Sequence, residues 1–168
     1  WPAEKGIYWW REFEVPPLHR DFSLVAEYGL DIIGIFLLWE DFQPEINRVS
    51  VPALKDLVRV ADLAQDRRIK ILPTFFCGHV TGINCLPPWM VERGKGEGRY
   101  PVFSMGKTRK GRARNQYSDR EVWKAQSASN ATAAYGIAII GAAHDAETFG
   151  MEKMAPNVPC RNAKASNP

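Results

Sequence analysis

The sequence has no long hydrophobic run. Its longest mostly apolar stretch, residues 32–39, is far shorter than the roughly 20 residues that a transmembrane helix needs. The first residue, Trp1, is neither an initiator methionine nor part of a basic and then apolar signal region, so we expect translation to begin upstream of it. The sequence therefore predicts no membrane-spanning segment.

Cysteine and net charge are both low. The three cysteines, Cys77, Cys85 and Cys160, are an odd number in a chain of 168 residues, which is long enough to bury a core without disulfides. Odd thiols are a liability in oxidising compartments, which favours the cytosol without fixing the localisation. The net charge is only +3, so overall electrostatics give no reason to expect a nucleic acid or a membrane surface as partner.

Glycine-rich turns directly after a strand are also missing. Dinucleotide-binding folds and P-loop proteins place such a turn at the end of a strand so that the backbone can approach a phosphate. We therefore expect no nucleotide cofactor, and no other cofactor is indicated. The basic residues are concentrated in one glycine-rich segment, residues 93–120, which contains nine Lys and Arg within residues 91–120 and is predicted to be a loop.

What the sequence does contain is an alternation of helical and strand patterns. Helical spacing of apolar residues predicts a helix over residues 17–28 and a second helix from about Pro52. Continuous apolar runs at 32–38 and 69–76 predict strands buried on both faces, as in parallel sheets. The starts of these strands lie 37 residues apart with a helix between them, which is typical of a crossover unit in a parallel α/β sheet.

A third helix and a third strand are predicted further along. Ser118 and Glu121 form a capping-box pattern for a helix over residues 119–135, and residues 137–140 could be a short strand. The remainder, residues 142–168, has no periodicity and is predicted to be an irregular, disordered tail. We therefore expect one domain over residues 1–141.

Polar and aromatic side chains follow both predicted strands. Trp39 and Glu40 come directly after the first strand, and His79, Asn84 and Trp89 follow the second. In α/β barrels the chemistry lies at the carboxyl ends of the strands. These residues are therefore the candidate binding residues.

Several blocks of sequence resemble a known enzyme group. FLLWEDFQP (residues 36–44), PTFFCGHVTG (73–82) and LPPW (86–89) are together similar to clan A glycoside hydrolases of the cellulase and endo-β-mannanase kind. The aromatic cluster near the N-terminus and RNQYSDREVWKAQ (114–126) also resemble that group, so the resemblance covers roughly residues 1–135. It implies a (β/α)8 barrel that hydrolyses β-glycosidic bonds with retention, using one Glu after the fourth strand and another after the seventh.

The chain departs from that pattern. It has no Asn-Glu pair, which the relatives carry at the acid/base position, and no counterpart of the seventh strand. Because a barrel takes about 200 residues or more, the resemblance implies the N-terminal half of one, about strands two to four with their helices. Gly34 stands where relatives have an Arg, and Cys85 where a Trp is usual. We therefore expect no catalytic residues here and no hydrolysis by this chain alone; otherwise Glu40, Asp145 or Glu147 would be suspected.

Two interpretations are open for each candidate binding residue. The Trp39 ring could stack on a pyranose or belong to the core, and Glu40 or Asp41 could bind sugar hydroxyls or be ordinary solvated carboxylates. His79 could bond a substrate hydroxyl or simply tether its loop. The resemblance favours an oligosaccharide or glycoside as the substrate.

Two other functions, metal binding and RNA binding, receive less support. Cys77, His79 and Cys85 could be zinc ligands with His144 or Cys160 as the fourth, but their spacing is irregular, so we expect no metal. The basic loop could bind RNA, although a solvated substrate lid is favoured, which leaves a non-catalytic carbohydrate- or RNA-binding module as the alternative function. Finally, a partial barrel leaves strand edges and an apolar strand face uncovered, so self-association is expected.

Overall fold

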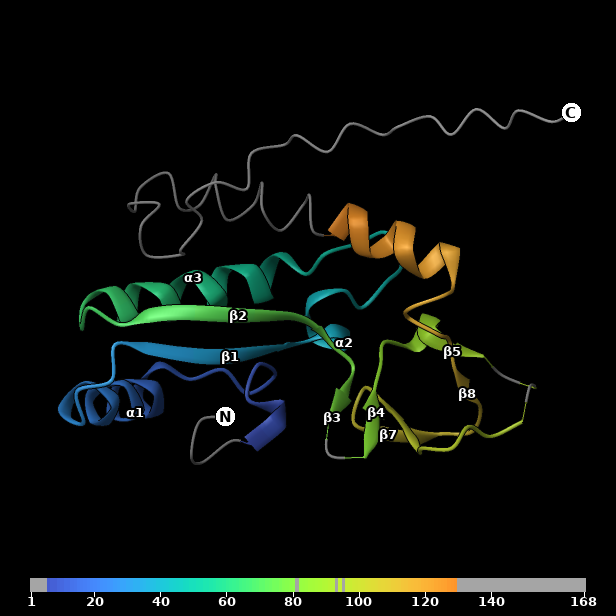
Figure 1. Cartoon of the computed structure of the whole chain (residues 1–168), viewed down its shortest axis with the longest axis horizontal. Helices are drawn as coiled ribbons and strands as arrows, with labels where there is room; N and C mark the ends of the chain where they lie inside the picture. The colour runs from blue at the N-terminus through green and yellow to red at the C-terminus, as the bar shows by residue number, and fades with distance from the viewer. Residues whose placement is uncertain (1–5, 81, 93, 95, 130–168) are drawn as a thin grey trace, which may run out of the picture.

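The fold is built around two parallel strands with two helices packed on one face. In the computed structural model, which describes residues 6–80, 82–92, 94 and 96–129, β1 (Ile32–Leu38) pairs with β2 (Lys70–Cys77). Helix α3 (Val51–Gln65) connects the two strands, and α1 (Val15–Glu27) precedes them (Figure 1). This is the α/β arrangement of part of a (β/α)8 barrel, as predicted from the sequence.

The helices form because their ends are well defined and one face of each is apolar. Helix α1 has proline in its first turn and is followed by Gly29, whose φ of +69° lets the chain leave the helix. Helix α3 begins at its N-cap Ser50, whose hydroxyl accepts the Ala53 N–H at 3.3 Å. Both helices begin within two residues of their predicted starts.

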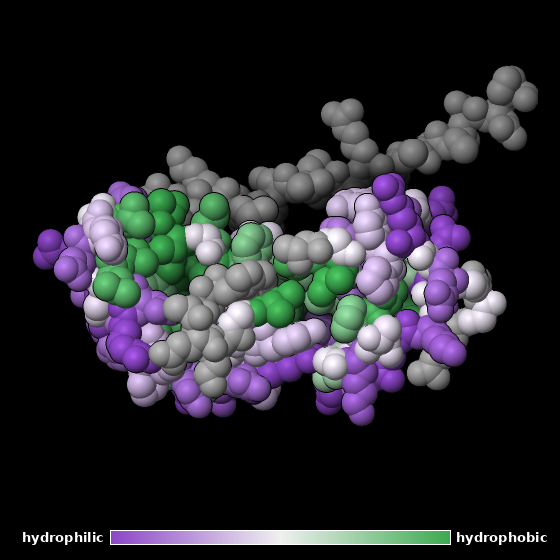
Figure 2. All heavy atoms as spheres, turned by 90° about the horizontal axis from the view of Figure 1, so that it is seen from below, coloured by the Kyte–Doolittle hydropathy of each residue, from purple (hydrophilic) through white to green (hydrophobic). Residues whose placement is uncertain are grey.

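One prediction about the strands is wrong. They were expected to be buried on both faces, but only the face toward the helices is covered, by residues such as Phe22 of α1 and Leu57 of α3. On the other face Ile32, Phe36 and Leu72 are 53%, 42% and 60% exposed. Figure 2 shows hydrophobic side chains gathered at the surface of the half of the molecule that holds α1, β1 and β2. The reason is that both helices pack on the same side of the strand pair.

The segment predicted to be a basic loop, residues 93–120, contains three short strands, and three more lie in the stretch just before it. A four-stranded sheet forms in the order β3-β4-β6-β7, and β5 pairs with β8 beside it (Figure 1). Val102 and Ser104 in this region are buried, so the region has a small core. The sequence did not indicate this core, because most residues of the segment are charged, polar or glycine. The bounds are β3 (His79–Val80), β4 (Ile83–Cys85), β5 (Val91–Glu92), β6 (Val102–Ser104), β7 (Lys107–Arg109) and β8 (Arg112–Ala113).

Three short helical turns complete the named elements. They are η1 (Gly6–Tyr8), α2 (Trp39–Phe42) and η2 (Pro88–Met90). Helix α2 follows β1 without a break, and no pattern in the sequence predicted it. Among the described residues, no helix combines the length and the apolar character that crossing a membrane requires.

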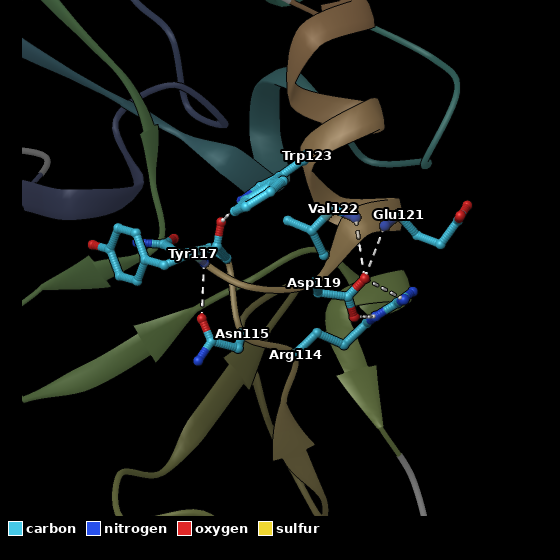
Figure 3. Close-up of polar contacts among 8 residues, drawn as sticks. Arg114, Asn115, Tyr117, Asp119, Glu121, Val122 and Trp123 are labelled. Atoms are coloured by element: carbon cyan, nitrogen blue, oxygen red, sulfur yellow. Dashed lines mark hydrogen bonds and ion pairs between the residues drawn. The ribbon is translucent and has the colours of Figure 1, made fainter. Parts of the chain in front are cut away.

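A further helix covers residues 120–129 of the described chain. Its cap is Asp119 and not the predicted Ser118: Oδ1 of Asp119 accepts the N–H groups of Glu121 at 3.0 Å and Val122 at 3.3 Å (Figure 3). Arg114 holds the same carboxylate with two hydrogen bonds of 2.8 and 2.9 Å. The predicted end of this helix, the strand at 137–140 and the tail at 142–168 lie outside the described residues.

Candidate functional site

The candidate site lies where β1 and β2 end. Phe36 pairs with Thr74, but the next pair is Leu38 with Cys77, so β2 contains an extra residue at this point. Phe76 within this bulge has a φ of +53°, which is unusual for a residue other than glycine. The bulge redirects the chain into the β3–β4 hairpin, which carries His79 and Asn84.

Trp39 lies in the core of this region. Its side chain is 1% exposed and packs with Leu86 and Met90, and its indole N–H donates to Oε1 of Gln43 at 2.8 Å. The sequence left two interpretations of Trp39 open, a ring that stacks on a sugar or a core residue. In the structure Trp39 is a core residue. In this position the ring offers no face to a sugar in solution.

Glu40 is fully buried and ionically paired. Its Oε1 accepts a hydrogen bond from Nη2 of Arg11, and its Oε2 accepts the backbone N–H of Met105 at 2.5 Å. Arg11 also donates from Nε to Oδ1 of Asp41 at 2.7 Å. Neither interpretation from the sequence describes Glu40, because it is neither solvated nor open to a ligand in this structure.

Burial dominates the electrostatics of this cluster. It raises the pKa of Glu40 and of Asp41 above their ordinary values, because a low-dielectric environment disfavours the charged form. Arg11 opposes that effect in both carboxyls. Among the described residues, Oδ2 of Asp41 is buried without a hydrogen-bond partner.

Cys85 is buried next to these charges. Burial first, and then the charge of Glu40, raises the pKa of its thiol to about 11, and the side chain of Tyr8 shares a hydrogen bond with it. The thiol is therefore neutral near pH 7 and a poor nucleophile. In the described part of the chain no three His, Cys, Asp or Glu residues lie close enough together to hold a metal ion, while His144 and Cys160 fall outside that part.

His79 and Asn84 face each other across the β3–β4 hairpin. Nδ1 of His79 lies 2.9 Å from Oδ1 of Asn84, and the Tyr100 ring meets the imidazole edge-on at 5.0 Å between centroids. Because a carboxamide oxygen only accepts, this contact is compatible with the tautomer of His79 that has its proton on Nδ1 and leaves Nε2 for another partner. His79 is exposed, so Nε2 can be reached from solvent.

Trp89 lines a depression beside α2. Its indole N–H donates to the Gln43 carbonyl at 3.2 Å, and its ring meets Trp39 edge-on at 5.7 Å. The depression has a volume of about 490 Å³ and is mainly apolar. Its lining consists of two prolines, one acid, two aliphatic side chains and this tryptophan, namely Pro44, Glu45, Ile46, Pro88, Trp89 and Met105.

Four of the five candidate residues form two contacting pairs, His79 with Asn84 and Trp39 with Trp89. The fifth, Glu40, is a buried acid. The structure also adds two residues that the sequence did not indicate. Arg11 pairs with both carboxylates, and Met105 both touches Glu40 and lines the depression. Arg11 stands in the N-terminal aromatic cluster, but nothing in the sequence links either residue to position 40.

Comparison with known proteins identifies the fold. No protein-family model matches the chain, and no curated protein matches it in sequence. Solved structures do match. A GH5_18 enzyme from Streptomyces cattleya in complex with GlcNAc is 23% identical, with a TM-score of 0.66 over 88% of this chain and 30% of that one.

Two further structures agree. An exo-beta-1,4-mannosidase from Opitutaceae bacterium strain TAV5 is 22% identical over 84% of this chain and 22% of its own, with a TM-score of 0.65. A GH5_18 protein from Bifidobacterium longum subsp. longum, in complex with Manb1-4GlcNAc, is 19% identical over 82% of this chain and 28% of its own, with a TM-score of 0.66. The chain spans less than a third of these proteins, and it has the fold of part of a (β/α)8 barrel.

Proposed function

We propose that this chain is a glycoside hydrolase-type protein acting on β-linked glycosides, related to the clan A barrels, and that the depression beside α2 binds a sugar unit. The observation that carries the proposal is Trp89. It is a half-buried aromatic side chain with a fixed indole N–H in an apolar depression at the carboxyl ends of parallel strands. This is the end of α/β barrels at which substrates bind.

The lining suits a sugar. The C–H face of a pyranose packs on an aromatic ring, while the hydroxyls at its edge need polar partners. Trp89 supplies the ring, and Glu45 at the rim supplies a carboxylate, 61% of whose side chain is exposed. Outside the residues that line the depression, the β3–β4 hairpin offers Nε2 of His79 and the amide group of Asn84, which can also bond hydroxyls. The similar structures hold GlcNAc or Manb1-4GlcNAc, which makes a β-linked mannoside our choice of ligand.

Hydrolysis by the chain alone is not part of the proposal. Retaining glycosidases need two carboxyl groups about 5 Å apart on either side of the scissile bond. Among the described residues, Glu40 and Asp41 are the adjacent buried acids of this region, and both are paired with Arg11. The absence of an Asn-Glu pair in the sequence points the same way.

Titration calorimetry with Manβ1-4GlcNAc tests the binding. We expect millimolar to micromolar affinity that Trp89→Ala weakens at least tenfold, because stacking is worth on the order of 1.5 kcal/mol. Trp123→Ala is the matched control, since Trp123 is half exposed and lies outside the depression. Equal affinity for the native chain and Trp89→Ala would contradict the proposed site.

The same preparation distinguishes the alternatives. Release of nitrophenol from an aryl β-mannoside would show that the chain hydrolyses glycosides by itself. Tight binding of single-stranded RNA that falls steeply with salt would favour the RNA-binding alternative, because phosphate contacts release counterions whereas stacking on a neutral sugar does not.

A further inference from the structure

The walls of the Trp89 depression are tied to α2 or to the residue that follows it. One wall is Trp89, whose indole N–H is bonded to the carbonyl of Gln43. A second wall is Met105, at the tip of the β6–β7 hairpin. Its backbone N–H is bonded to Oε2 of Glu40. Glu40 and Gln43 lie at the start of α2 and directly after it, so one short element sets the position of both walls.

The hairpin tip has an unfavourable backbone. Met105 has a φ of +52° and Gly106 a φ of +74°, a pair of left-handed residues in a two-residue turn between β6 and β7. Glycine, asparagine and aspartate suit the first of these positions, and methionine does not. A hydrogen bond from the Met105 N–H to a buried carboxylate offsets this strain, because charge-assisted bonds in a dry environment are strong.

Arg11 makes that carboxylate possible. A buried carboxylate is costly unless it is paired, and the guanidinium of Arg11 bonds Glu40 and Asp41 together. The guanidinium also lies over the Tyr8 ring, 4.6 Å from its centroid. A Cβ atom built on Gly106 would lie 3.3 Å from Nη1 of Arg11, so the hairpin tip rests directly on this cluster.

We propose that Glu40 is a positioning residue: the Arg11-supported carboxylate holds the strained Met105–Gly106 turn against α2 and thereby fixes the second wall of the sugar depression, without itself contacting the sugar. That Met105 forms a wall of a sugar site rests on the proposed function. That Glu40 holds the Met105–Gly106 turn does not rest on it. Both can therefore be measured separately.

Amide hydrogen exchange tests the holding of the turn. In the native chain we expect the Met105 N–H, although it lies at a hairpin tip, to exchange at least 100-fold more slowly than an unprotected amide. Glu40→Gln keeps an oxygen that can accept this N–H and should accelerate its exchange less than tenfold. Glu40→Met, of similar length but without an acceptor, should accelerate it at least 100-fold. Glu45→Gln changes an exposed acid of the same depression and should leave the exchange unchanged.

The exchange rates decide whether Glu40 holds the Met105–Gly106 turn. Equal acceleration in Glu40→Gln and Glu40→Met would show that Glu40 only supports the fold, and an unprotected Met105 amide in the native chain would overturn the proposal without any variant. If Glu40→Met does not fold, the native protection and the Glu40→Gln rate still decide. Loss of Manβ1-4GlcNAc affinity in step with faster exchange would connect the turn to sugar binding. If the native chain binds no sugar while the exchange pattern holds, only the proposed function fails.

Discussion

Trp39 and Trp89 are alike in the sequence and different in the structure. Each follows a predicted strand, so the sequence offers both as candidates for a binding surface. The structure buries Trp39 against Leu86 and Met90 and leaves Trp89 at the edge of a depression. Gly78 contributes to the packing around Trp39, because a side chain at this position would meet Leu86 and the Trp39 ring.

Substitution of Gly78 tests this packing. A Cβ atom at this position would lie 2.7 Å from Cδ2 of Leu86 and 3.4 Å from Cε3 of Trp39. We expect Gly78→Ala to lower the free energy of unfolding by about 1–3 kcal/mol through overpacking, measured by urea denaturation. Gly34→Ala is the matched control, since nothing lies within 4 Å of its Cβ position, and it should change stability by less than about 0.5 kcal/mol. Similar effects of both substitutions would contradict the packing argument.

At the same scale, the sequence placed the candidate residues after the strands but could not predict which of them are buried. His79, Asn84 and Trp89 lie near the strand ends as expected, whereas Glu40 proved to be inside the protein. Its partner Arg11 is 29 residues away in sequence, and its other partner is the backbone N–H of Met105, 65 residues away. A backbone donor leaves no trace in residue identity, so no pattern in a single sequence could have revealed it.

At the scale of elements, long periodic segments were predictable and short ones were not. β1, β2, α1 and α3 were predicted because a buried face leaves a clear apolar pattern in 7 to 15 residues. The strands β3 to β8 contain two or three residues each, and Val102 of β6 belongs to a small core with Leu86 and Met90. Two or three residues cannot show a period, so residues 93–120, which hold β6 to β8, were predicted to be a loop.

The cap of the helix at 120–129 carries a prediction of its own. Asp119 accepts two helix N–H groups, and the Arg114 guanidinium holds its pKa below the ordinary value. Because the folded pKa is depressed, this stabilisation is present above the unfolded value of 3.8 and is lost as the pH falls through the folded pKa. Asp119→Ala should therefore accelerate amide exchange at Glu121 and Val122 about fivefold at pH 7, and this effect should become smaller as the pH falls through the folded pKa.

Nuclear magnetic resonance can follow those two amides directly. Ser118→Ala is the control, because Ser118 was the cap expected from the sequence and the structure gives that role to its neighbour. A larger effect of Ser118→Ala than of Asp119→Ala would restore the original expectation.

At the scale of the whole molecule, the uncovered sheet face is the dominant feature. Ile32, Phe36 and Leu72 expose apolar surface on adjacent parallel strands, and such contiguous patches promote association. We expect the 168-residue chain to self-associate at tens of micromolar, as seen by sedimentation velocity. Leu72→Glu should raise the dissociation constant at least tenfold, because a charge would have to be buried in the contact.

The control for this experiment is Leu24→Glu, which changes a leucine that is 51% exposed on α1 and not on the sheet face. It should leave the sedimentation profile unchanged. A sharp monomer peak for the native chain at these concentrations would show that the exposed face does not drive association.

The sheet of β3, β4, β6 and β7 is inserted into the chain between β2 and the helix at 120–129, and its hairpin tip reaches α2 through the Met105 N–H. Half of the residues that line the depression, Pro88, Trp89 and Met105, therefore come from a stretch of chain that does not take part in the pairing of β1 with β2. Insertions or deletions in that stretch can remodel the depression while leaving the register of the parallel strands intact. One side of the depression can thus change in evolution while the other side, Pro44, Glu45 and Ile46, stays attached to the end of α2.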